Sequence, residues 1–180
     1  AYLKLGDVYF ELNKNQLARE HLDKAVGVSI AIGDRELEAM ANVSLAGVSD
    51  SVNDRQKAKE HCEKVITISR ECGNRKCEAQ LYQSVGLLST SFGEYDKAAY
   101  YLQKARSISS EIGHKMTEFR SLLSITILKL SQLENVEAME YLLQGIEKYE
   151  QIRNLQKGNS GLKISLLEQH GSFPYKLLTH

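Results

Sequence analysis

The three cysteines and five histidines of this sequence are the side chains best suited to metal or nucleophilic chemistry. Cys72 and Cys77 follow the pattern C-x4-C, and His61-Cys62 precedes them. A structural zinc site needs four ligands at tight spacing, which this set does not supply. Cys62 falls where the sequence elsewhere carries leucine, and Cys72 falls where it carries isoleucine. We therefore expect packing thiols, which behave as small hydrophobic groups, and no bound metal.

No local motif predicts catalysis. The sequence has no Ser-His-Asp, Cys-His or paired-carboxylate arrangement, and its glycines follow neither G-x-G-x-x-G nor the P-loop pattern. His21 and His61 share one repeat position beside a core position, which predicts a role at the helix surface. We therefore expect a protein that is not an enzyme and that needs no cofactor.

The composition argues against several classes of partner. With 23 basic and 23 acidic residues the formal net charge is zero, whereas nucleic acids and anionic membranes attract a basic excess. No run approaches the roughly 18 apolar residues of a membrane span. We expect no nucleic-acid partner, no membrane insertion and, without a convergent set of polar groups, no small-molecule substrate.

The cysteines and the amino terminus suggest the cellular context. An odd number of cysteines without framework spacing predicts a reduced, cytoplasmic protein. The opening stretch AYLKLGDVYF lacks the basic start and long apolar run of a signal peptide. Because the chain starts at Ala1 without a methionine, we read it as a piece of a longer protein. The first hairpin lacks the equivalent of residues 36–40, so we expect a further repeat before Ala1.

The elements that would position any site recur at an interval of forty residues. Positions at this interval form columns of similar residues, such as Ala18, Ala58, Ala98 and Ala138; Leu22, Cys62, Leu102 and Leu142; and Leu5, Leu45, Val85 and Ile125. Self-similarity at one interval is the signature of a repeat array. The alanine column predicts places where two helices cross too closely for a large side chain.

Each unit contains two segments with apolar residues at helical spacing. The first segments are expected at 1–12, 36–51, 76–92 and 116–131, and the second at 16–32, 55–72, 95–112 and 135–152. A single proline in the chain favours this helical reading. Gly33, Gly73 and Gly113 stand just past second segments, where a left-handed residue ends a helix. In the fourth unit Arg153 replaces the glycine, and Asn154 is the candidate for the left-handed residue.

These residues resemble the tetratricopeptide repeat (TPR) pattern, W-x2-L-G-x2-Y followed by A-x3-F. The stretch YLKLGDVY at 2–9 is followed by Ala18 and Leu22, and YQSVG at 82–86 is followed by Ala98 and Leu102. The forty-residue unit is similar to that of the Leu-Gly-Asn-repeat and kinesin-light-chain groups. The resemblance implies an all-α, right-handed superhelical solenoid of antiparallel hairpins over 1–153, with repeats at 1–35, 36–75, 76–115 and 116–153.

Residues 154–180 break the repeat pattern and are expected to form an irregular linker toward a downstream domain. The stretch LEQHGSFPYKLLTH at 167–180 is similar to the segment that leads into a C-terminal CHAT domain in CHAT-associated TPR proteins. That resemblance implies an alternative function, as the regulatory arm of a caspase-like protein whose catalytic or pseudo-catalytic part lies beyond residue 180.

TPR solenoids bind through the concave surface lined by the first helix of each hairpin, so the resemblance implies a scaffold for a protein or peptide partner. The groove positions of the family correspond here to Asp7, Phe10, Glu11, Val43, Gly47, Asp50, Gln83, Leu87, Thr90, Arg120, Leu123 and Ile127. A mixed apolar and polar lining of this kind suits an extended or helical peptide.

Two features of that lining narrow the range of partners that it could bind. Chaperone-binding TPRs clamp a terminal carboxylate with several basic residues, whereas these positions supply mainly Arg120. Modulator-type arrays carry an asparagine just before the Leu-Gly pair, to bind peptide backbone. The matching residues here are Lys4, Ser44, Ser84 and Ser124, and a ladder of serine hydroxyls could donate hydrogen bonds instead.

Overall fold

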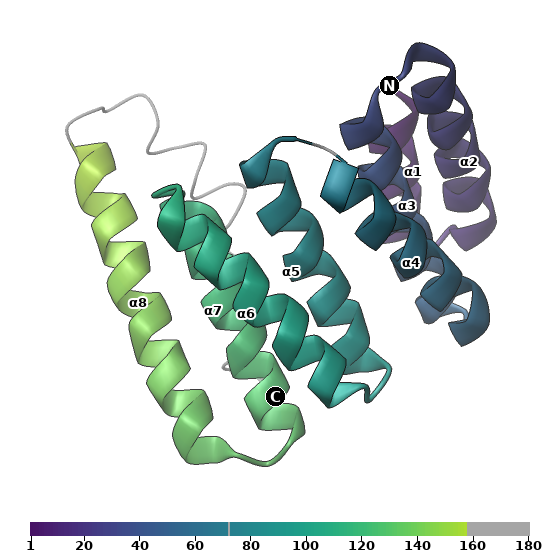
Figure 1. Cartoon of the computed structure of the whole chain (residues 1–180). Coiled ribbons are helices and arrows are strands. Elements are labelled where there is room, and N and C mark those ends of the chain that lie inside the picture. Colours follow the sequence, from purple (N-terminus) through teal and green to yellow (C-terminus); the bar gives the residue numbers. More distant parts are fainter. Residues whose placement is uncertain (72, 158–180) are drawn as a thin grey trace.

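A computed structural model describes residues 1–71 and 73–157, and throughout this part the chain is helical apart from short connections. The helices are α1 (Tyr2–Glu11), α2 (Asn15–Ile32), α3 (Arg35–Ser51), α4 (Arg55–Glu71), α5 (Arg75–Ser91), α6 (Tyr95–Glu111), α7 (Lys115–Ser131) and α8 (Asn135–Lys157). They follow one another across the molecule in chain order (Figure 1). The predicted all-α fold class is confirmed.

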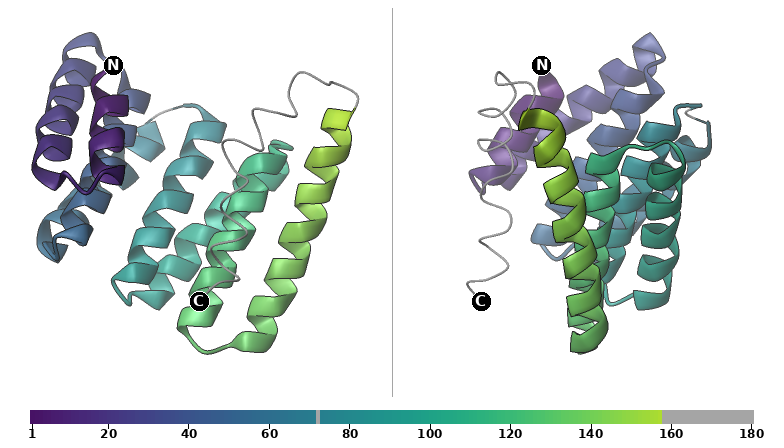
Figure 2. Two further views of the ribbon diagram at one scale, coloured as in Figure 1. Left: turned by 180° about the vertical axis from the view of Figure 1, so that it is seen from behind. Right: turned by 90° about the vertical axis from the view of Figure 1, so that its left-hand side faces the viewer.

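The helices pair into four antiparallel hairpins, α1–α2, α3–α4, α5–α6 and α7–α8, which we number 1 to 4. Each hairpin packs on the next, because α2 contacts α3, α4 contacts α5 and α6 contacts α7. The side views show the hairpins stacked in succession (Figure 2). The result is the solenoid of hairpins that the forty-residue period predicts.

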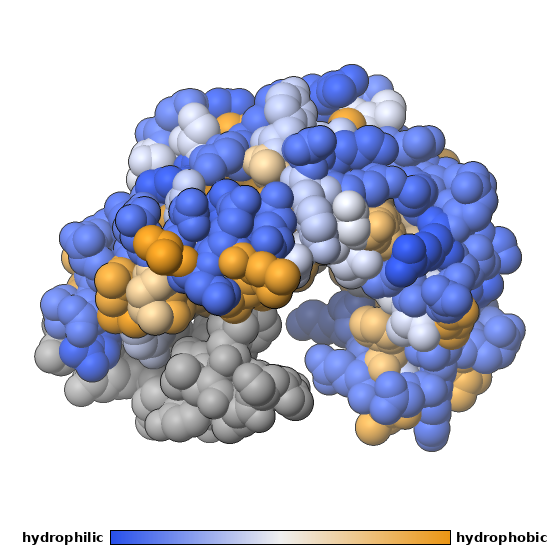
Figure 3. Space-filling view, turned by 90° about the horizontal axis from the view of Figure 1, so that it is seen from below, coloured by the Kyte–Doolittle hydropathy of each residue, from blue (hydrophilic) through white to orange (hydrophobic). Residues whose placement is uncertain are grey.

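The solenoid curves with its first helices on the inner side. Helix α1 contacts α3, α3 contacts α5 and α5 contacts α7. Successive second helices meet through scattered side chains, such as Arg106 of α6 and Gln144 of α8. Because the first helices lie closer together than the second, the array bends into an arch with a hollow on one side (Figure 3).

Left-handed residues recur at the same interval as the helices. Gly33, Gly73 and Gly113 have φ values of 72°, 61° and 65°, which confirms their predicted role at the ends of second helices. The turns inside the hairpins also repeat, with positive φ at Asn13, Asn53, Gly93 and Leu133. Identical turns at a fixed interval set successive hairpins at similar angles, which is how the local sequence produces a regular stack.

The residue that follows each of these glycines caps the next helix. Asp34, Asn74 and His114 each accept a hydrogen bond from the backbone N–H three residues on, at 2.9, 3.3 and 3.2 Å. Such caps satisfy N–H groups that have no partner within the helix. The polar residue after each glycine is therefore explained by helix initiation.

A basic residue next to the cap links the two helix ends that lie opposite the turn of the hairpin. Arg75 donates to Glu78 at 2.8 Å and to Glu111, the last residue of α6, at 2.7 Å. Arg35 makes the equivalent pair of contacts in hairpin 2. The start of the first helix is thus tied to the end of the second helix of the same hairpin.

The apolar columns form most of the core, although Leu5 in the first hairpin is exposed. The alanine column is fully or almost fully buried in all four hairpins, and Cys62 packs with Val65 and Ile68 in one buried cluster. Burial raises the pKa of the Cys62 thiol to about 12, as expected for a packing residue. Cys72 lies outside the described residues.

The fourth second helix is longer than its sequence predicts. Helix α8 continues to Lys157, and Asn154 is helical and is absent from the left-handed positions of the described chain. The suggestion that Asn154 ends this helix is therefore wrong. Without a glycine after Ile152, nothing in the backbone stops the helix there, and the following Arg, Leu, Gln and Lys residues are good helix formers. Most of the expected linker at 154–180 lies outside the described residues.

Candidate functional site

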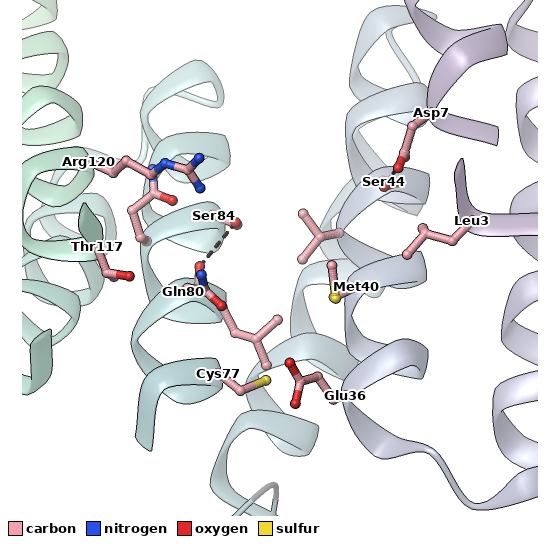
Figure 4. Close-up of a pocket in the computed structure, with 13 residues that line it drawn as sticks. Leu3, Asp7, Glu36, Met40, Ser44, Cys77, Gln80, Ser84, Thr117 and Arg120 are labelled. Carbon is pink, nitrogen blue, oxygen red and sulfur yellow. Dashed lines mark hydrogen bonds between the residues drawn. The ribbon is translucent and has the colours of Figure 1, made fainter. Parts of the chain in front are cut away.

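The inner surface contains a hollow where hairpins 2 and 3 meet. It has a volume of about 210 Å³ and lies between the N-terminal halves of α3 and α5, with α1 and α7 at its edges. Its lining residues are Leu3, Asp7, Glu36, Met40, Val43, Ser44, Cys77, Gln80, Leu81, Gln83, Ser84, Thr117 and Arg120. Figure 4 shows these side chains on two facing walls. We call this site the inner hollow.

The inner hollow exists because the first helices of four hairpins reach one surface. Residues at one face of a helix recur every three or four positions, and Glu36, Met40 and Val43 follow this spacing on α3. Cys77, Gln80 and Ser84 repeat it on α5. The same face of successive hairpins therefore supplies both walls.

Polar contacts hold the walls of the inner hollow in place. On one wall Ser44 donates to Asp7 at 2.7 Å, which joins α3 to α1. On the other wall Gln83 donates to Ser124 at 2.7 Å, which joins α5 to α7. These contacts cross between hairpins, so they fix the positions of successive first helices as well as their own side chains.

The three serines at the positions of the family's asparagine already donate hydrogen bonds within the protein. Ser44 donates to Asp7, whereas Ser84 and Ser124 donate to the carbonyl oxygens of Gln80 and Arg120 in their own helices. A ligand that used these hydroxyl protons would have to displace an existing bond. The serine hydroxyl oxygens can still accept hydrogen bonds, although that of Ser124 already accepts one from Gln83.

Charge is distributed unevenly around the inner hollow. Asp7 and Glu36 supply carboxylates on the α1 and α3 side, and Arg120 supplies a guanidinium on the α7 side. Glu36 also accepts from Asn74 at 3.3 Å. Leu3 and Met40 add apolar surface on the same side as the two carboxylates.

Four of the sequence-predicted groove residues line the inner hollow: Asp7, Val43, Gln83 and Arg120. Others lie farther along the first helices and pack or bond between hairpins. The ring of Phe10 lies against Gly47, where a Cβ atom would stand 3.7 Å from it, and Asp50 accepts from Ser91 at 2.9 Å. These residues form the seam between neighbouring first helices.

The remaining predicted positions do not line the inner hollow. Thr90 is buried and donates to the carbonyl of Gly86 at 3.0 Å. Leu123 is buried against Phe119 and Ile152, because α7 lies under α8 at this point. Glu11, Leu87 and Ile127 are more open but also lie outside the lining.

Sequence reasoning missed lining residues in the N-terminal halves of the first helices, chiefly Glu36, Met40 and Gln80. The sequence could have indicated them, since each lies three or seven residues before a predicted groove position on the same helix face. The forty-residue period does not show that neighbouring first helices leave space between them at these residues. Arg120 also belongs to the column of Met40 and Gln80, one helical turn before the column of Val43 and Gln83.

The histidines are less exposed than predicted. His61 is partly buried, its Nδ1 lies 2.9 Å from Asn42 Oδ1, and burial lowers the pKa of this imidazole. The His21 ring stacks on Tyr9 with centroids 5.2 Å apart. Both rings therefore lie between the helices of their hairpin and contribute to packing.

In the part of the chain that the structure describes, no group of three or more His, Cys, Asp or Glu side chains could hold a metal ion. No helix of residues 1–71 or 73–157 combines the length and the apolar character needed to cross a bilayer. The inner hollow is therefore the best-defined candidate for a binding site.

Comparisons with known proteins agree with this architecture. Residues 1–29 match the family model for the tetratricopeptide repeat. A comparison with curated protein sequences gave no match. The matched residues lie within the α1–α2 hairpin, which carries one of the two clearest copies of the motif.

Two solved structures share the fold. A Rap protein complexed with competence and sporulation factor covers 82% of this chain with a TM-score of 0.72 at 20% identity. The apo form of RapI covers 98% of it with a TM-score of 0.71 at 17% identity. The chain spans 41% and 64% of the lengths of these two proteins. Residues 1–29 thus match a tetratricopeptide repeat, and the described part of the chain has the helical-hairpin fold of these two solved structures.

Proposed function

We propose that this chain is a protein-interaction scaffold and that the inner hollow binds a segment of a peptide or protein partner. The observation that carries the proposal is the inner hollow itself, which apolar and polar groups from four separate first helices line together. A lining drawn from several repeats suits a ligand that runs across the array. The Rap protein solved with competence and sporulation factor offers a precedent for ligand binding by a protein of similar fold.

The size of the inner hollow suggests how a partner would be held. At about 210 Å³ it is smaller than the roughly 300–1,000 Å³ of sites that enclose a small molecule. It has room for one or two side chains of a partner whose main chain lies across the inner surface. Apolar anchors of this kind contribute most of the energy of protein interfaces.

The charged residues of the inner hollow suggest how a partner segment is oriented in it. A basic group near Asp7 and Glu36 and an acidic group near Arg120 would each meet the opposite charge. We therefore favour a partner segment with an apolar anchor between a basic and an acidic residue.

The test is capture of partners by the chain and two variants. Met40→Glu places a carboxylate in the inner hollow, and Val28→Glu makes the same change on α2 at a side chain of similar exposure. Captured proteins are identified by mass spectrometry, and both variants are checked by circular dichroism. We expect wild type and Val28→Glu to retain the same partner and Met40→Glu to lose about tenfold or more in affinity, as for loss of an anchor contact. Equal capture by all three would contradict the proposal.

A further inference from the structure

The last described helix ends close to the inner hollow. Helix α8 runs antiparallel to α7, and near its end Ile152 packs against Phe119 of α7. The end of α8 therefore lies beside the start of α7, where Arg120 lines the inner hollow. Residues 158–180 follow this helix and lie outside the described part of the chain. A segment of them that reached the inner hollow would approach it from the α7 side.

The inner hollow presents its charges in a fixed order from the α7 side. The guanidinium of Arg120 comes first. The far side combines the apolar side chains of Met40 and Leu3 with the carboxylates of Glu36 and Asp7 (Figure 4). A matching ligand that enters from α7 therefore carries an acidic residue first, and apolar and basic residues together after it.

Residues 168–176 of this chain, with the sequence EQHGSFPYK, have that order. Glu168 comes first, and the aromatic residues Phe173 and Tyr175 stand next to Lys176. Aromatic side chains are common anchors at protein interfaces, and a thioether such as that of Met40 packs favourably against them. We call residues 168–176 the tail segment. Its chemistry is complementary to the inner hollow in the direction that the topology imposes.

The length of chain is sufficient for this contact. At about 3.3 Å per residue, an extended chain covers about 36 Å between Lys157 and Glu168. Neighbouring packed helices lie about 8 to 10 Å apart, so two such steps separate α7 from α3 by roughly 20 Å. From Glu168 to Lys176 an extended chain spans about 26 Å. Pro174 disfavours a helical backbone at the residue before it, which suits a segment that crosses the array in extended form.

We propose that the tail segment binds in the inner hollow of the same molecule, with Glu168 at Arg120 and Lys176 on the carboxylate side. Phe173 is its apolar anchor. This inference rests on the proposed function, because it takes the inner hollow to be a peptide site and names an occupant from the chain itself. A guanidinium has five N–H donors, so Arg120 can bind a carboxylate beside the contacts that it already makes. A partner must then displace the tail segment, and its apparent affinity is reduced to the fraction of molecules in which the inner hollow is open.

The test is photo-cross-linking in the full chain at low protein concentration. The photoreactive residue p-benzoylphenylalanine replaces Phe173, and its cross-links are located by mass spectrometry. We expect cross-links within one molecule to residues of the inner hollow, Met40 among them. Arg120→Glu should lower their yield about threefold or more, as for loss of one ion pair, and adding Glu168→Arg should restore it. Lys97→Glu makes the same change of charge at an exposed residue of α6, outside the lining, and should leave the yield unchanged.

Three results would overturn the proposal. The first is a set of cross-links that avoids the inner hollow, and the second is covalent dimers in place of cross-links within one molecule. The third is an equal yield with Arg120→Glu and Lys97→Glu, since the order of charges fixes the direction of the tail segment. If Arg120→Glu changes the circular dichroism spectrum, Glu168→Arg alone is compared with wild type, because that residue lies after the last repeat.

The result can be told apart from failure of the proposed function. If the tail segment does not cross-link to the inner hollow but Met40→Glu still loses its captured partner, the tail does not bind there and the proposed function stands. Cross-links in the inner hollow together with equal capture by Met40→Glu and wild type would support binding of the tail segment and contradict binding of a partner. Where both bind, Phe173→Asp should increase capture of the partner, because it removes the competing anchor.

Discussion

Gly86 of α5 lies directly against Leu102 of α6. A Cβ atom on this glycine would stand 2.6 Å from the leucine Cγ and 3.2 Å from the leucine backbone nitrogen. Gly6 and Leu22 have the same relationship in hairpin 1, with a Cβ-to-Cγ distance of 2.5 Å. The close crossing of the two helices thus depends on a missing side chain on one helix and a large one on the other.

Hairpin 2 solves the same packing problem with different residues. Ala46 stands in the glycine column and Cys62 in the leucine column, and both are buried in one cluster. The added methyl group on one helix is matched by a shorter side chain on the other. In hairpins 1 to 3 a larger residue in the glycine column thus goes with a smaller one in the leucine column, whereas hairpin 4 combines Thr126 with Leu142.

This relationship predicts the effect of Gly86→Ala. In a helix interior alanine is favoured over glycine by about 1 kcal/mol, but the overpacked contact with Leu102 should cost about 1 to 3 kcal/mol. We expect a net loss of stability. In a double-mutant cycle measured by urea denaturation, adding Leu102→Cys should give a favourable coupling of about 0.5 kcal/mol or more. Additive effects would show that the two columns are independent.

Leu133 is the one left-handed position among the turns inside the hairpins that carries neither glycine nor asparagine. Its side chain is largely exposed, so packing does not compensate for the backbone strain. A left-handed conformation costs a residue with a Cβ roughly 1 to 2 kcal/mol, and asparagine tolerates it better. Leu133→Asn should therefore raise the free energy of unfolding by about 0.5 to 1 kcal/mol.

Leu130→Asn is the matched control for that prediction. Leu130 is also exposed but lies in the last turn of α7 with a helical backbone, where asparagine is a poorer helix former than leucine. We expect this variant to lose stability slightly while Leu133→Asn gains it. If both variants shift the denaturation midpoint in the same direction, hydrophobicity and not backbone strain is responsible.

Most of the fold could be predicted from the sequence because the period and the glycines are local signals. The helix expected at 36–51 is found at Arg35–Ser51, and that expected at 95–112 is found at Tyr95–Glu111. The turn at Leu133 carried no such signal, since leucine has no preference for a left-handed backbone. The length of α8 was misjudged for a related reason, because Asn154 can either cap a helix or continue one.

The candidate site was less predictable than the fold. Asp7 and Gln83 were identified because they match the groove positions that the family resemblance implies, whereas the depth of the surface around them depends on how far apart α3 and α5 lie. The separation of α3 and α5 depends on how many residues of α4 pack against α5, and no single repeat position determines it. Leu123 illustrates the opposite error, because its column faces the groove in hairpins 2 and 3 but is covered by α8 side chains in hairpin 4.

The cap at Asn74 should matter more than the neighbouring ion pairs of Arg75. Asn74→Ala removes the acceptor for two backbone N–H groups and should cost about 1 kcal/mol in unfolding free energy. The Arg75 guanidinium is exposed to solvent, where ion pairs contribute little and are screened by salt. We expect Arg75→Ala to lower the melting temperature by less than Asn74→Ala does, and its effect to fade at high salt. A larger effect for Arg75→Ala would mean that the clamp between the hairpin ends dominates.

The His114 cap should make the stability of the array depend on pH. Burial lowers the pKa of His114 and nearby Lys76 lowers it further, and Nδ1 can accept from Thr117 only when it is unprotonated. The unfolded chain, with a histidine pKa of about 6.5, therefore binds the proton more readily than the folded chain. The stability contributed by this cap is fully present above about pH 6.5 and is lost as the pH falls below that value.

His114→Asp tests this dependence with the residue that hairpin 2 uses at the same position. A carboxylate caps the helix without titrating near neutrality and interacts favourably with the helix N-terminus, by about 0.3 to 1 kcal/mol. In denaturation experiments at about pH 7.5 and about pH 5.5, on either side of the histidine range, the advantage of the variant over wild type should widen at the lower pH. His61 is common to both proteins, so its titration cancels in the difference. Asn74→Asp makes the equivalent change without removing a histidine, and its difference from wild type should stay constant. A His114→Asp profile parallel to that of wild type would mean that this imidazole remains unprotonated throughout the range.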